Sequence, residues 1–113
     1  GLRALLDWEL AHIGDPAEDI GWLCTRSWRF GGAARVGGVG ALDDLLGAYA
    51  DAGGEPIDVA QVRYWEVHGN LRWGVIAMAQ AFSHLHGSRR SVELAAIGRR
   101  VTEVEHDLME LLG

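Results

Sequence analysis

The sequence predicts a mainly α-helical fold of about four helices, preceded by one short N-terminal β-strand or hairpin remnant. Two observations carry this prediction. Apolar residues recur at steps of three and four along most of the chain, and residues that start or stop helices stand at the limits of these stretches. A chain of 113 residues has room for one domain, so residues 1–113 are expected to form a single domain.

The first expected elements are a short strand and a helix. Leu2 to Leu6 followed by Asp7 is typical of a short strand, which needs a partner strand to form a sheet. Asp15 can cap a helix, Pro16 suits its first position, and a glutamate three residues after Asp15 completes the capping-box spacing. We therefore expect a helix from about Pro16 to Arg29.

A loop and two further helices are expected in the middle of the chain. Residues 30–40 contain five glycines without a periodic pattern, which predicts a loop. A second helix over residues 41–52 is stopped by a pair of glycines. Asp58 and Gln61 have the capping-box spacing and begin a long helix to about His86, in which two glycines mark close packing or a bend.

The last expected helix has a continuous apolar stripe at steps of three and four. Its members are Leu94, Ile97, Val101, Val104, Leu108 and Leu111. Such spacing fits a homotypic coiled coil, but two to three heptads in a helical domain more often form an ordinary core face, and we favour the core face.

Composition excludes several classes of protein. The positive charge comes from ten arginines without any lysine, so a Walker or Schiff-base lysine is absent from the chain. A net charge of −6 argues against a nucleic-acid surface, and no apolar run approaches the length of a membrane span. Cys24 is the single cysteine and is expected to be a small buried residue without a disulfide. These features favour a cytoplasmic protein.

Asp7 is the first candidate for chemistry. A carboxylate just after a strand is well placed to bind Mg²⁺, which prefers one or two carboxylates together with phosphate oxygens and water. A turn aspartate is the alternative. His84 and His86 point about 200° apart on a helix and do not form a zinc pair. His12 could approach substrate phosphates or remain a solvated loop residue.

The segment "LLDWELAHIGDPAEDIGWLC" resembles the aminoglycoside phosphotransferase and choline kinase-like family, in which a strand ends in a metal-binding aspartate and a "GDPxxD" helix start follows. The stretches "RYWEVHGNLRWGVIAMAQAFSHL" and "RSVELAAIGRRVTEVEHDLMELL" are similar to the helical C-terminal part of the branch found near acyl-CoA dehydrogenases. The resemblance implies that the chain is the helical C-terminal subdomain of a protein-kinase-like fold.

The resemblance also implies roles for three aspartates. Asp7 would hold Mg²⁺ on the phosphates of ATP, Asp15 would cap a helix, and Asp19 would fasten the catalytic loop without taking part in catalysis. The family's H-G-D catalytic loop and its nucleotide-binding lobe are not found in the sequence, and the "HGN" at His68 lies inside an expected helix. We therefore expect no activity from this chain alone, although the complete enzyme would use Mg²⁺ and ATP.

The small-molecule hydroxyl acceptor would bind the helical region. Trp65, Arg72 and Trp73 are candidates for the wall of its pocket, whereas the alternative for the tryptophans is a place in the core. An aromatic wall with arginines suits an anionic, acyl-CoA-like acceptor better than a polycationic aminoglycoside.

A second class of function is a stand-alone helical module or gene remnant that acts through homo-oligomerisation or protein interaction. A stand-alone chain would leave its strand edge and apolar surfaces uncovered, which favours association. We would then expect a homodimer, with the strands paired or a helix exchanged.

Overall fold

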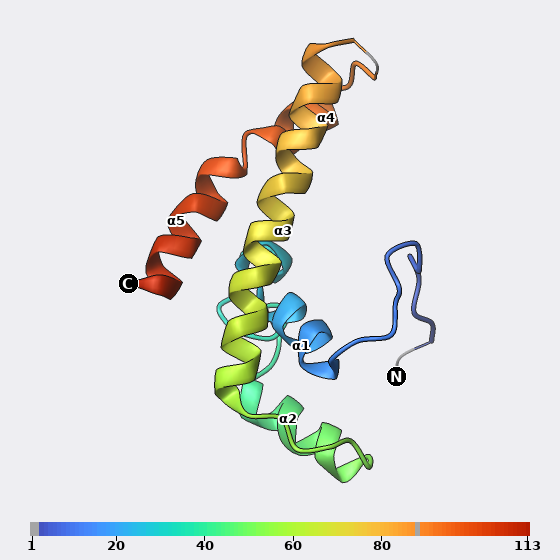
Figure 1. The fold of residues 1–113 in the computed structure, drawn as a ribbon, viewed down its shortest axis with the longest axis vertical. Coiled ribbons are helices and arrows are strands. Elements are labelled where there is room, and N and C mark those ends of the chain that lie inside the picture. Colours follow the sequence, from blue (N-terminus) through green and yellow to red (C-terminus); the bar gives the residue numbers. More distant parts are fainter. Residues whose placement is uncertain (1–2, 88) are drawn as a thin grey trace.

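A computed structural model describes residues 3–87 and 89–113 and confirms a mainly helical fold (Figure 1). The long helix α3 runs through the whole molecule, and α1, α4 and α5 all contact it. The radius of gyration is 15.6 Å, against about 13 Å for a compact chain of this length, so the molecule is elongated. The elements are α1 (Pro16–Cys24), the 3₁₀ helix η1 (Arg26–Arg29), α2 (Leu42–Asp51), α3 (Val59–Leu85), α4 (Val92–Gly98) and α5 (Val101–Leu112).

The starts of α1 and α3 confirm the capping predictions. Asp15 precedes α1 and accepts a hydrogen bond from the backbone N–H of Ala17, with proline in the first turn. Asp58 precedes α3 and forms the complete capping box with Gln61. These caps satisfy N–H groups that have no partner within the helix, and the residues that supply them are all local in sequence.

The first helix ends earlier than predicted. It stops at Cys24, and a separate 3₁₀ helix covers Arg26–Arg29. Thr25, between the two, has an extended ψ of 133° and donates a hydrogen bond from its buried hydroxyl to the carbonyl of Gly21. The chain therefore changes direction at Thr25.

The predicted strand at Leu2 to Leu6 is wrong for the residues that the structure describes. Residues 3–8 have no regular structure, and Leu2 lies outside the described residues. A strand needs a neighbour to satisfy its backbone groups, and residues 3–87 and 89–113 provide none for it. The bridges that do form lie in the glycine-rich loop, between Ala34 and Gly38 and between Val36 and Gly40.

The predicted single C-terminal helix is also wrong, because the chain breaks at Arg99 and Arg100 into α4 and α5. The helix α4 packs on the end of α3, where a Cβ added to Gly98 would lie 2.5 Å from the Cβ of Ala81. The helix α5 instead turns back along α3 (Figure 1) and brings Val104 against Gly74. Val104 is buried, as the core-face interpretation of the stripe requires.

The apolar core is small and joins α1, α2, α3 and the glycine-rich loop. Its buried residues are Ile20, Cys24, Val36, Leu42 and Val62. Burial raises the pKa of the Cys24 thiol, in agreement with the prediction of a small buried residue.

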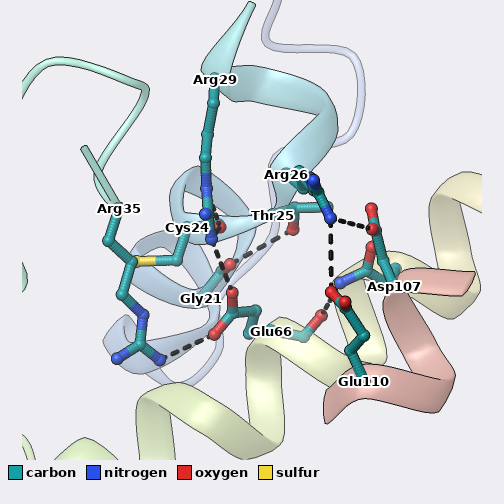
Figure 2. A network of polar contacts seen from close by, with 10 residues as sticks. Gly21, Cys24, Thr25, Arg26, Arg29, Arg35, Glu66, Asp107 and Glu110 are labelled. Carbon is teal, nitrogen blue, oxygen red and sulfur yellow. Dashed lines mark hydrogen bonds and ion pairs between the residues drawn. The ribbon is translucent and has the colours of Figure 1, made fainter. Parts of the chain in front are cut away.

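A buried carboxylate lies beside this core (Figure 2). Glu66 of α3 is 3% exposed and accepts hydrogen bonds from Arg29, at 3.2 Å, and from Arg35, at 2.8 Å. On the other side of η1, Arg26 pairs with Asp107 and Glu110 of α5. These ion pairs tie η1 and the glycine-rich loop to α3 and α5.

Candidate functional site

A hollow lined by several of the predicted site residues lies between the N-terminal segment and the helical body. We call residues 3–14 the arm; Figure 1 shows it standing away from the helices. The hollow has a volume of about 830 Å³, and α1, η1 and α3 line the side opposite the arm. It therefore combines residues that lie more than 60 positions apart in the sequence, from Asp7 to Trp73.

Asp7 lies on the arm and lines the hollow. Its side chain is exposed and makes no hydrogen bond or ion pair with the residues that the structure describes. Its φ is +69°, in the left-handed region that few residues other than glycine adopt, although aspartate tolerates it better than most. Backbone strain of this kind is concentrated at functional sites.

Asp15 and Asp19 flank the start of α1. One carboxylate oxygen of Asp15 caps the helix, and the other accepts a hydrogen bond from the indole N–H of Trp65 at 3.0 Å. Asp19 is exposed, lines the hollow, and has no hydrogen-bond partner among the described residues. Its expected role, fastening a catalytic loop, stays a prediction.

The structure brings together two of the three residues expected in the acceptor pocket. Arg72 and Trp73 line the hollow, but Trp65 does not. Trp65 lies on nearly the same side of α3 as Arg72, but about 11 Å nearer the N-terminal end of the helix. There its indole N–H donates to Asp15. The hollow therefore includes two of the three candidates, and the acceptor pocket itself stays a prediction.

Two further tryptophans, Trp22 and Trp28, complete the aromatic wall. The ring centroid of Trp28 is 5.3 Å from that of Trp22 and 5.0 Å from that of Trp73. The three rings are half-buried and line the hollow. The indole nitrogens of Trp28 and Trp73 are buried without an acceptor among the described residues. The high number of tryptophans in the sequence is the one signal of an aromatic wall. Which of them come together depends on the turn at Thr25.

The charged groups at the hollow are mostly acidic. Arg72 pairs with Glu18 at 3.0 Å, and its guanidinium carbon lies 5.5 Å from the centre of the Trp22 ring. Glu18 also meets His12, at 2.9 Å. The remaining acidic side chains of the lining are Asp7, Glu9, Asp15 and Asp19.

His12 is held at the edge of the hollow. The backbone carbonyl of Leu10 and the carboxylate of Glu18 both accept from its ring and raise its pKa above 6.5, with the carbonyl contributing most. His12 is thus a partly exposed loop residue that already has an acidic partner.

The structure groups no three histidine, cysteine, aspartate or glutamate side chains as a metal centre within residues 3–87 and 89–113. Asp7 and Asp19 both offer carboxylate oxygens that have no other partner among the described residues, and Mg²⁺ commonly takes its remaining ligands from water and phosphate. In the same described part of the chain, no helix is both long and apolar enough to cross a membrane.

Comparison with known proteins defines the class. The model of the phosphotransferase enzyme family, APH, matches residues 1–65, which is more than half of the chain. The chain belongs to this family. The matched segment contains the arm, α1, η1, α2 and the start of α3. No curated protein and no solved structure matches the chain.

Proposed function

We propose that the chain is the helical C-terminal part of an ATP-dependent small-molecule O-phosphotransferase of the cytoplasm, from the branch found near acyl-CoA dehydrogenases. In this proposal Asp7 holds Mg²⁺ on the nucleotide phosphates, and the hollow receives the acceptor that bears the hydroxyl group. Membership of the phosphotransferase family supports the class of reaction.

The observation that carries the proposal is the location and exposure of the Asp7 carboxylate. It lies within the segment that matches the family, on a strained backbone, with a free and exposed carboxylate at the same hollow as Arg72 and Trp73. When bound, Mg²⁺ would neutralise charge on the phosphates. The carboxylate of Asp7 would supply one ligand to the ion, and Asp19, which lines the same hollow from α1, is available to hold a catalytic loop.

The composition of the hollow bears on the acceptor. Its lining contains five carboxylates but one arginine, and that arginine is already paired with Glu18. An anionic acceptor, which the sequence favoured, would meet unfavourable charge there. Tryptophan faces attract cations and pack against apolar groups. We therefore propose a neutral or cationic acceptor, bound against Trp22, Trp28 and Trp73.

Phosphoryl transfer requires groups that this sequence does not contain. The family's H-G-D loop and phosphate-binding lysine are missing from the 113 residues, and the reaction depends on positioned phosphates, a base and metal ligands acting together. We therefore expect the chain alone to bind Mg·ATP weakly and to transfer no phosphate.

The test uses Mn·ATP as a paramagnetic probe of the 113-residue chain, because relaxation of nearby amide signals detects weak binding. We expect selective broadening around residues 5–9, with loss of this broadening in Asp7→Asn. Asp44→Asn, an exposed aspartate of α2, is the matched control and should leave the broadening unchanged. Equal broadening in Asp7→Asn would overturn the metal assignment.

A further inference from the structure

The outer face of α3 carries a continuous apolar stripe that nothing in the described chain covers. We call Leu71, Val75, Met78, Phe82 and Leu85 the outer stripe. Their side chains are 52% to 71% exposed, and their spacing alternates steps of four and three. Tyr64, also exposed, continues the same line seven residues earlier.

The outer stripe is distinct from the face that builds the fold. The buried residues of α3 point to the other side of the helix, toward α1 and α5. Alternating steps of four and three keep side chains on one seam of a helix, which is the arrangement that two-stranded coiled coils use. A surface helix normally exposes its polar side, so an apolar seam on the exposed side indicates a contact that the single chain does not satisfy.

We propose that the outer stripe pairs with the outer stripe of a second copy of this chain, as an antiparallel two-helix interface. Charge favours this occupant. The charged side chains of α3 other than histidine are Arg63, Glu66 and Arg72, and the last two are engaged in ion pairs within the chain. Each copy has a net charge of −6, so association is favoured along a face without exposed carboxylates, and Glu66, the one acidic residue of α3, is buried within its own chain.

The side chains of the stripe are also complementary to themselves. In an antiparallel pair with the two-fold axis at Met78, Leu71 faces Leu85 of the second copy. Val75, which is small and β-branched, then faces the large ring of Phe82. A two-fold interface requires this reciprocal matching, in which each contact occurs twice. The size alternation across the pair allows the seam to fill without gaps.

The length of the stripe sets the expected affinity. From Tyr64 to Leu85 the seam extends about 31 Å, and a single helix face of this length forms an interface at the small end of specific complexes. We therefore expect a dissociation constant on the order of micromolar. This inference does not depend on the phosphotransferase proposal, because it rests on α3 alone.

Analytical ultracentrifugation of the 113-residue chain from about 1 to about 300 µM brackets that affinity. We expect a reversible monomer–dimer equilibrium, weakened roughly 100-fold by Met78→Glu, which places two carboxylates together on the axis. Met109→Glu, at an exposed position of α5, is the matched control and should leave the equilibrium unchanged. A wild-type chain that stays monomeric, or a dimer that survives Met78→Glu, would overturn the proposal.

Two cysteine variants test the orientation. Oxidation of a mixture of Leu71→Cys and Leu85→Cys chains should join one variant to the other, and the wild type, with its thiol buried, should remain uncrosslinked. Leu71→Cys joined to itself would indicate a parallel pair and overturn the antiparallel arrangement. Loss of the dimer in Leu6→Glu, with an intact dimer in Met78→Glu, would assign the interface to the arm and contradict the proposal.

Discussion

In the helical body, side-chain contacts join residues far apart in the sequence, whereas in the arm they join near neighbours. Glu66 pairs with arginines 37 and 31 positions before it, and Arg26 reaches Asp107, 81 positions away. In the arm, the indole of Trp8 donates to the carbonyl of Leu5, and the contact of His12 with Glu18 spans six positions. The body is thus positioned by tertiary contacts and the arm mainly by its own turns.

Because their contacts differ in this way, we expect the two sides of the candidate site to differ in rigidity. The aromatic wall belongs to helices that are tied together by buried ion pairs, while Asp7 belongs to the arm. Segments with few buried contacts open at lower free energy than packed helices. We therefore expect the body to provide a fixed surface, and the arm to adjust its position against it.

The largest expected effect is a loss of stability of the helical body. Glu66→Gln removes the charge that two arginines share and leaves them one neutral acceptor oxygen in place of two carboxylate oxygens. Breaking a buried pair costs about 3–5 kcal/mol. The arginine side chains are 22% and 36% exposed, so we expect the free energy of unfolding to fall by about 2–3 kcal/mol. Chemical denaturation measures this loss, and Glu105→Gln, at an exposed position of α5, should change stability little.

The next effect tests the contact between α1 and α3. A Cβ at Gly21 would lie 2.5 Å from the Cβ of Trp65 and 2.7 Å from the backbone nitrogen of Glu66, so Gly21→Ala should destabilise the chain by about 1–3 kcal/mol. Gly47→Ala is the matched control, because Gly47 lies within α2 with open space around it. That change should stabilise the chain by about 0.5–1 kcal/mol. Equal effects would show that close packing at Gly21 is unimportant.

The smallest effect concerns the arm. The pKa of His12 is raised, so its contribution to holding the arm is fully present below pH 6.5 and is lost as the pH rises through the raised value. Hydrogen exchange of the arm amides, corrected for intrinsic rates, should therefore show less protection above that pH, with the body unchanged. Glu18→Gln should lower the pKa of His12 in an NMR titration without restoring the ordinary value, because the Leu10 carbonyl remains. An unchanged pKa would exclude the Glu18 contact in solution.

The predictions that held depended on local signals. The caps at Asp15 and Asp58 need only a few consecutive residues, and both helices begin where these residues predict. The break between α4 and α5 was not predictable in this way. The apolar spacing continues across it, and the break adjoins the close packing of Gly98 on Ala81, a tertiary contact that the sequence pattern does not contain.

The candidate site was predictable in part for the same reason. Asp7 was expected from a motif, and Arg72 and Trp73 were expected as an aromatic residue with a nearby arginine in the helical region. Trp22 and Trp28 join the wall only because the chain turns between them at Thr25. The burial of Glu66 has one signal in the sequence, because Glu66 is the one acidic residue of α3.

The burial of Cys24 makes its thiol a probe of how often the native core opens. The side chain has 0% exposure, and its thiol belongs to the core that joins α1 to α3. A thiol reagent can reach it only when these helices separate, so the rate of labelling reports how often the native chain opens. Movement of the arm alone would leave the labelling rate unchanged. Labelling of the native Cys24 thiol therefore distinguishes opening of the core from movement of the arm.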